Sequence, residues 1–105
     1  MKSNGQYLLT ALFIVILCFA SALQAGDSLD HDQAADLRKQ GLVLPLEKIL
    51  TAAKRLHQGR VIEVELEEKR GQYVYEIEIV DADGRVWEMK FNGSDARLLS
   101  EEQDD

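Results

Sequence analysis

The stretch YVYEIEIVDADGRVWEMKF, residues 73–91, decides the fold, because apolar and charged residues alternate through it almost without a break. Before the Asp83-Gly84 pair, apolar residues occupy one parity and glutamates the other. After the pair, the same alternation resumes and continues to Phe91. A period of two predicts half-buried strands, and a turn pair between two such strands predicts a β-hairpin.

A third alternating segment precedes this hairpin, at residues 60–69, and Arg70-Gly71 separates the two as a two-residue turn. The sequence therefore predicts strands at residues 60–69, 72–81 and 85–91, with a short edge strand at 97–99. If Lys69 faces Gln72, the apolar parities of the first two strands coincide. A three-residue loop, Ala82 to Gly84, brings the third strand into the same alignment, with Gly84 in the left-handed region.

This register predicts an inner sheet face of three apolar rows, in which Trp87 is largely buried. The rows are Ile62-Ile79-Trp87, Val64-Ile77-Met89 and Leu66-Tyr75-Phe91.

Two helices are expected before the strands. Residues 33–40 predict a short helix with Asp32 as N-cap and Gly41 as its end. A longer helix follows Pro45 and ends near Gly59, which we expect to be a left-handed terminator. Its apolar stripe consists of Leu46, Ile49, Leu50, Ala53 and Leu56. The expected fold is α+β: an N-terminal helix, with a short helix before it, packed on one face of a three- to four-stranded antiparallel meander.

The opposite, outer face concentrates carboxylates. The register places Glu63, Glu78 and Glu88 side by side, and directly opposed like charges on a sheet are unfavourable. Two interpretations remain open, a solvated face or a surface that binds a partner. The candidate partner-binding face comprises Val61, Glu63, Glu65, Glu76, Glu78, Val80, Val86 and Glu88.

The N-terminal quarter differs from the rest of the chain, because Lys2 is its only charge before Asp27 and an apolar run is followed by small residues. This pattern predicts a cleavable signal peptide over residues 1–25, and hence a periplasmic protein. Cleavage after Ala22 and retention as a membrane anchor remain alternatives. Residues 26–32 are then a polar leader, 33–99 the domain, and 100–105 an acidic disordered tail.

The composition excludes several functions. The chain carries 12 basic and 19 acidic residues, a net charge of −7, so it should repel nucleic acid and anionic membrane surfaces. Its only cysteine, Cys18, lies within the predicted signal. No arrangement of nucleophile, base or paired acids indicates an enzyme, and a hydrolase is not supported. The Asp30-His31-Asp32 run lacks the converging ligands of a structural metal site, and no cofactor is expected.

Several motifs together resemble the PepSY domain of small exported bacterial proteins. They are LPLEKIL at 44–50, GRVIEVELE at 59–67, YVYEIEIVDADGRVWEMKF at 73–91 and ARLL at 96–99. The resemblance implies a non-enzymatic periplasmic protein that binds an envelope protein such as a peptidase and modulates or inhibits it. The alternative is a cation-responsive accessory of an envelope signalling system, in which the acidic face binds divalent cations weakly.

Overall fold

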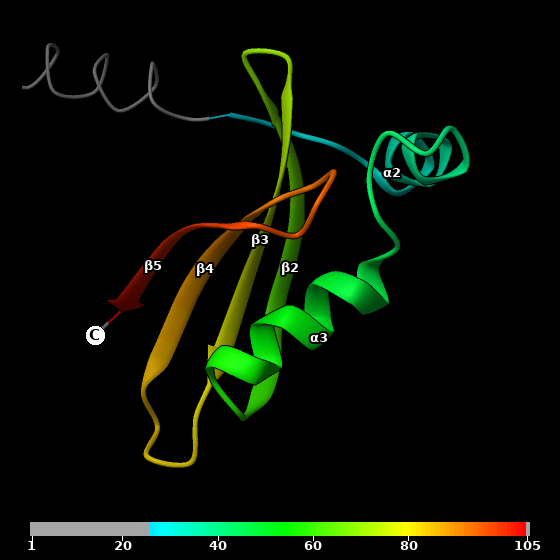
Figure 1. Cartoon of the computed structure of the whole chain (residues 1–105). Helices are drawn as coiled ribbons and strands as arrows, with labels where there is room; N and C mark the ends of the chain where they lie inside the picture. Colours follow the sequence, from blue (N-terminus) through cyan, green and yellow to red (C-terminus); the bar gives the residue numbers. More distant parts are fainter. Residues whose placement is uncertain (1–25, 105) are drawn as a thin grey trace, which may run out of the picture.

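The computed structural model describes residues 26–104, which form an antiparallel sheet with a helix across one face (Figure 1). The α+β class is confirmed, but the sheet has five strands rather than three or four, in the order β1-β2-β3-β4-β5. The elements are β1 (Asp27–Ser28), α2 (His31–Lys39), α3 (Leu46–Leu56), β2 (Arg60–Lys69), β3 (Gln72–Val80), β4 (Val86–Asn92) and β5 (Leu98–Asp104). The predicted signal peptide lies outside the described residues, and the expected polar leader forms β1 and the start of α2.

The β3–β4 hairpin confirms the predicted register along its whole length, from Val74 opposite Asn92 to Val80 opposite Val86. Its loop is held by the carboxylate of Asp81, which accepts hydrogen bonds from the backbone N–H groups of Asp83 and Arg85, both at 2.9 Å. Gly84 has a φ of 81°, the left-handed conformation expected of it.

The β2–β3 pairing agrees with the prediction only from Glu63 to Lys69. A register shift lies between Val61 and Glu63, so Val61 faces Ile79 and the predicted pairing of Ile62 with Ile79 is wrong. A bulge places one extra residue on its strand and reverses the side-chain alternation beyond it. Val61 therefore packs against the core, whereas Ile62 is 47% exposed.

Gly59, just before this bulge, is needed for a close approach rather than for ending the helix. Helix α3 ends at Leu56 with His57 as C-cap, so the predicted role of Gly59 as left-handed terminator is wrong. A Cβ atom on Gly59 would lie 2.2 Å from the carbonyl oxygen of Val80. Only glycine lets the backbone pass the end of β3 at this distance.

The C-terminal residues correct a second prediction. A strand over 97–99 followed by a disordered tail was expected, but β5 spans Leu98–Asp104 and pairs with β4. Backbone hydrogen bonds to the open edge of β4 order this segment, and such bonds require no apolar side chain. All seven residues of β5 are exposed, so the strand has no buried side whose apolar residues could have predicted it from the sequence.

The core lies between α3 and the inner face of the sheet. Ile49 and Ala53 of α3 are fully buried there, while Leu56, expected on the same stripe, is 45% exposed. The buried sheet residues are Leu66, Tyr75, Ile77, Ile79, Met89 and Phe91. Val64 lies on the same side of the sheet as these residues but is 41% exposed. The helices therefore do not fully cover the inner face at β2. Trp87 is only partly buried, less than predicted.

Helix α2 begins earlier than predicted, because Asp30 rather than Asp32 is its N-cap. The Asp30 carboxylate accepts the N–H of Gln33, whose side chain accepts the N–H of Asp30, a capping box. The predicted end is confirmed: Gly41 follows the C-cap with a φ of 74°. The buried Tyr75 hydroxyl donates to the carbonyl of Leu44 at 3.1 Å, which ties the segment between the helices to the sheet.

Candidate functional site: the acidic outer face

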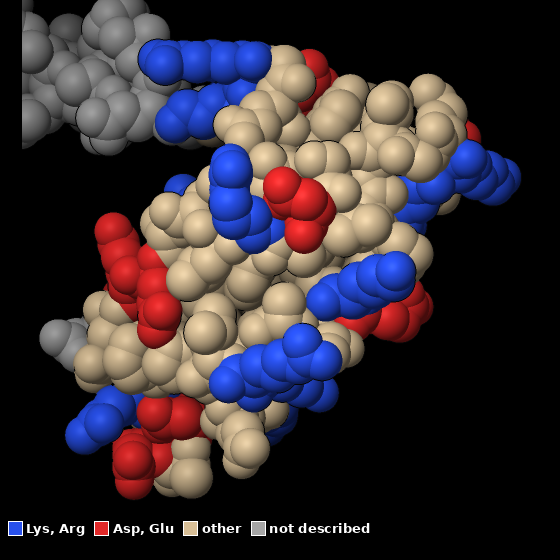
Figure 2. Space-filling view, viewed as in Figure 1, with Lys and Arg blue, Asp and Glu red and all other residues tan. Residues whose placement is uncertain are grey.

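The outer face of the sheet, opposite α3, carries a row of four glutamates. Glu63, Glu78, Glu88 and Glu102 are consecutive partners across β2, β3, β4 and β5. Beside this row, Glu65, Glu76, Lys90 and Ser100 form a second one. On the side that carries α3, basic side chains interrupt the acidic ones (Figure 2). Charge is therefore distributed unequally between the two faces.

The register brings seven of the eight predicted face residues to this side and leaves out Val61, which the bulge turns toward the core. Val80 and Val86 are partners as expected, but Arg60 and Asp104 flank them in place of Val61. Sequence reasoning missed Glu102 because the tail was not expected to form a strand. Residues 100–104 are all polar, so no alternation of apolar and polar side chains predicted a strand there.

Glu76 is the most strongly perturbed carboxyl of the face. A side-chain hydrogen bond with Glu88, burial, and a further hydrogen bond with Glu67 together raise the pKa of Glu76 to about 8. Two carboxyl groups can share a hydrogen bond only if one holds a proton. The face therefore binds a proton at neutral pH that an isolated glutamate would release.

The pKa values of two neighbouring glutamates are also raised. Burial, a hydrogen bond with Glu63 and the charges around it raise the pKa of Glu78 above its ordinary value. Burial and the charges of Glu67 and Glu63 likewise raise the pKa of Glu65, although Lys90 opposes this effect. Like-charge repulsion on this face is therefore relieved partly by proton uptake rather than by basic partners alone.

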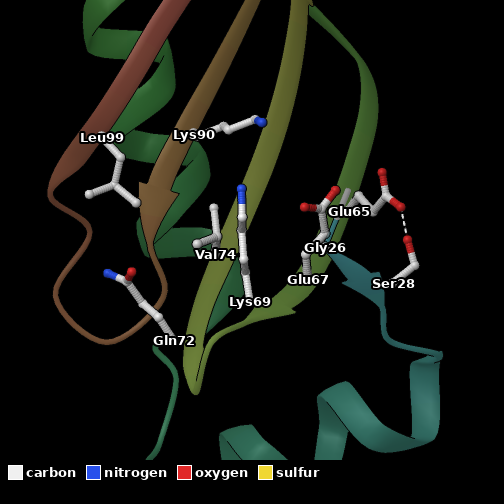
Figure 3. Close-up of a pocket in the computed structure, with 9 residues that line it drawn as sticks. All are labelled: Gly26, Ser28, Glu65, Glu67, Lys69, Gln72, Val74, Lys90 and Leu99. Atoms are coloured by element: carbon white, nitrogen blue, oxygen red, sulfur yellow. Dashed lines mark hydrogen bonds between the residues drawn. The ribbon is translucent and has the colours of Figure 1, made fainter. Parts of the chain in front are cut away.

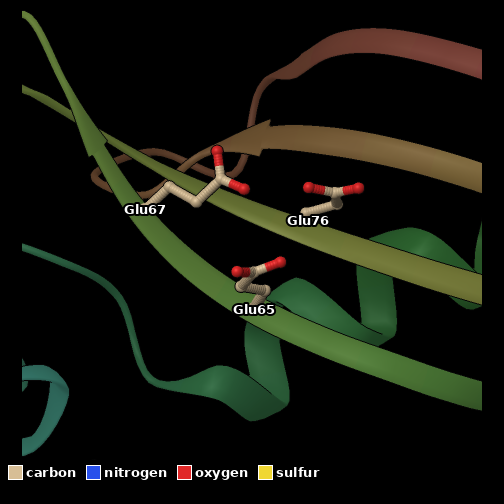
Figure 4. A group of neighbouring side chains, drawn as sticks. All are labelled: Glu65, Glu67 and Glu76. Atoms are coloured by element: carbon tan, nitrogen blue, oxygen red, sulfur yellow. The ribbon is translucent and has the colours of Figure 1, made fainter. Parts of the chain in front are cut away.

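A shallow cavity of about 440 Å³ lies at the β2–β3 hairpin end of the face (Figure 3). Its wall includes Glu65, Glu67 and Lys90, and Val74 and Leu99 supply apolar surface. Ser28 of β1 donates a hydrogen bond to the Glu65 carboxylate at its rim. The carboxylates of Glu65 and Glu67, from β2, lie near that of Glu76, from β3 (Figure 4). The arrangement can bind cationic groups, either on a protein or as free ions.

A second polar cluster lies on the other face, at the end of α3. The imidazole of His57 stacks on the indole of Trp87, with ring centroids 3.9 Å apart, and its Nε2 contacts the Glu101 carboxylate. The indole N–H donates to Asp81 at 2.9 Å, and this bond, with those from Arg85 and Asp83, lowers the pKa of Asp81. Each group in the cluster has a partner that explains its position, so its arrangement is that of a structural clamp between helix and sheet.

The fold and the face together define a small α+β domain, one helix over an antiparallel meander, whose distinguishing surface is a charged sheet face. The family model PepSY, described as peptidase propeptide and YPEB domain, matches residues 43–102, which is more than half of the chain, and the chain belongs to this family. The match includes α3 and most of the sheet. Domains of this family are generally non-catalytic propeptide or regulatory domains.

No curated protein and no solved structure matches the chain. Within residues 26–104, no helix is long and apolar enough to cross a membrane.

Proposed function

We propose that this chain is an exported, non-catalytic protein that binds a peptidase of the cell envelope through its acidic outer face and restrains it. Membership of the PepSY family carries the proposal, because the description of the family model names peptidase propeptides. The four-glutamate row supplies a surface that a basic region of the partner would complement.

The geometry of the face favours a protein partner. Val80 and Val86, both half-buried, form an apolar strip directly beside the glutamate row. Apolar area contributes to affinity, whereas complementary charge mainly accelerates association and selects the partner. A basic partner would therefore bind with a strong dependence of its association rate on salt.

The test uses the mature protein as bait in an envelope extract, followed by an assay of the captured peptidase on a protein substrate. The triple variant Glu63→Gln, Glu78→Gln, Glu88→Gln keeps the shape of the face and removes its charge. The matched control, Asp36→Asn, Glu47→Gln, Asp83→Asn, removes as many exposed charges elsewhere. We expect wild type and control to capture and inhibit the peptidase and the face variant to lose both. Equal capture by all three proteins would refute the role of the face.

A second candidate is a cation-responsive accessory of an envelope signalling system. It is favoured by two carboxylate triads, Glu65-Glu67-Glu76 and Glu76-Glu78-Glu88, in each of which the ligand oxygens lie within 4.8 Å of one another. Glu76 belongs to both triads, so Glu76→Gln should abolish any stabilisation by millimolar calcium or magnesium in a thermal melt. An equal increase in melting temperature for wild type and Glu76→Gln would exclude these triads.

A further inference from the structure

Strand β2 has an open edge along most of its length. In the described part of the chain, β1 covers only Glu67 and Glu68, and no strand pairs with the same side of β2 from Arg60 to Glu65. The carbonyl of Leu66 accepts the N–H of Leu29 at 2.9 Å, so the backbone groups of Leu66 point to this edge. Alternation along the strand points those of Val64 to the same edge. An unpaired row of this kind is a template for another strand.

The inner side of this edge is apolar and not fully covered. Ile62 and Val64 are 47% and 41% exposed, whereas the core residues of β3 and β4 are at most 1% exposed. These core residues are Tyr75, Ile77, Ile79, Met89 and Phe91. Next to Val64, a cavity of about 340 Å³ opens between β2 and the two helices, with Leu46, Leu66 and Tyr75 in its wall. An extended chain beside β2 could insert its inner side chains here.

The outer side of the same edge is acidic. Glu63 and Glu65 alternate with the apolar residues, so one face of an added strand would lie beside carboxylates and the other beside aliphatic groups. Strand β5, at the opposite edge of the sheet, differs, because Glu101 and Gln103 occupy its inner side and Glu102 and Asp104 its outer side. Charges on both sides protect an edge, whereas the β2 edge is amphipathic.

The N-terminal segment shows that this edge accepts a strand. Asp27 and Ser28 pair with it in antiparallel fashion, and the Ser28 hydroxyl hydrogen-bonds the Glu65 carboxylate from the outer side. The chain then turns away into α2, leaving the next six residues of β2, Arg60 to Glu65, without a partner among residues 26–104.

We propose that the β2 edge binds an extended segment of the partner, in which basic residues alternate with apolar ones, as an additional strand of the sheet. The segment spans Arg60 to Glu65, a length of about 20 Å for six residues. Its basic side chains contact Glu63 and Glu65, and its apolar side chains cover Ile62 and Val64. A second copy of this chain fits less well, because two β2 edges would place glutamates opposite glutamates. The identity of the partner as a peptidase rests on the proposed function, but the edge and its chemistry do not.

The probe is a blocked hexapeptide of alternating lysine and valine, with fluorescence anisotropy as the readout. We expect saturable binding and slower hydrogen exchange of the Val64 amide. A peptide N-methylated at alternate residues keeps its charge but cannot donate edge hydrogen bonds, and it should bind at least about tenfold more weakly, equivalent to about 1.4 kcal/mol. Equal affinity for both peptides would overturn the inference, because it would place the peptide on the outer face instead.

Two variants with equal changes of charge separate the edges. Ile62→Lys with Val64→Lys alters the β2 edge, and Leu98→Lys with Gln103→Lys alters β5, where both side chains are exposed and their residues pair with Phe91 and Trp87, away from the acidic face. The β2 variant should lose at least about tenfold in peptide affinity and the β5 variant less than about twofold. Equal losses would show that the effect depends only on net charge and would overturn the inference. The inference would also be overturned if the free protein sedimented as a dimer joined through β2.

The same proteins are used to capture the peptidase, so the two proposals can fail separately. If the β2 variant loses the peptide but still captures the peptidase, the edge is not the partner's site and the proposed function stands. If wild type binds the peptide at β2 but captures no peptidase, the proposed function fails and the edge site stands.

Discussion

The raised pKa of Glu76 makes the stability of the domain depend on pH in a direction opposite to that of most carboxylates. Its pKa is about 8 in the folded state and its ordinary value is 4.5. The folded state therefore holds a proton that the unfolded chain releases, and the stability this confers is complete below about pH 4.5 and lost as the pH rises through about 8. Glu78 and Glu65, whose pKa values are also raised, act in the same direction.

The magnitude follows from the pKa difference and from the exposure of the site. A difference of 8 − 4.5 = 3.5 pH units corresponds to a ceiling of about 5 kcal/mol. Glu76 is only half-buried, so water screens its neighbours, and we expect about 1 kcal/mol. For a domain of this size, that is a change of about 4–8 °C in melting temperature between about pH 5 and pH 8.5.

The assay is thermal unfolding followed by circular dichroism over this pH range, for wild type, Glu76→Gln and the exposed control Glu47→Gln. The glutamine is neutral at every pH, so Glu76→Gln should resemble wild type at about pH 5 and melt at a higher temperature at about pH 8.5. The control should follow wild type throughout. A wild-type melting temperature that rises with pH, or a Glu76→Gln profile as steep as that of wild type, would refute the reasoning.

Three further outcomes are expected. Mass spectrometry of the periplasmic fraction should find a mature N-terminus near Gly26, and an intact Met1 in the membrane fraction would contradict cleavage. Trp87→Ala should lower the free energy of unfolding in a denaturant titration by about 2–3 kcal/mol, because the indole stacks on His57 and donates a hydrogen bond to Asp81. The loss should be smaller than for a fully buried tryptophan, because the indole is partly exposed. A near-neutral result would contradict the clamp. Glu102→Lys places a cation opposite Glu88 and should raise stability by about 0.5 kcal/mol, whereas a loss would show that the β4–β5 register differs in solution.

The parts of the fold that the sequence predicted correctly are those determined by local signals. The β3–β4 register follows from alternation and from Gly84, both visible within one hairpin. The bulge at Ile62 has no comparable signal, because a Val-Ile pair is equally consistent with either parity and the close contact of Gly59 with Val80 is made only in the folded chain.

The acidic face was predicted only in part, because local sequence signals mark some of its residues and not others. Three of the four glutamates in its main row lie in strands with clear alternation, whereas Glu102 lies in a segment whose order depends on the open edge of β4. The pKa of Glu76 could not be predicted either. It depends on hydrogen bonds with Glu88 and Glu67, side chains that register alone places near each other but does not orient.

The strand order of the sheet repeats the order of the strands in the chain, and this has a consequence for how the domain opens. Strands β2 to β5 are joined by short loops, so bringing neighbouring strands together costs little loop-closure entropy. Their pairing should therefore form early in folding and open last. Strand β1 instead meets β2 across both helices and is held by two residue pairs. Residues 26–41 can therefore detach as a separate cooperative unit while the hairpins remain intact. This opening would lengthen the free edge of β2 from six residues to nearly the whole strand. It would uncover Ala34, Leu29 and Leu37 at the margin of the core but leave the core between α3 and the sheet in place, so a partner that captured the opened state would bind a longer edge.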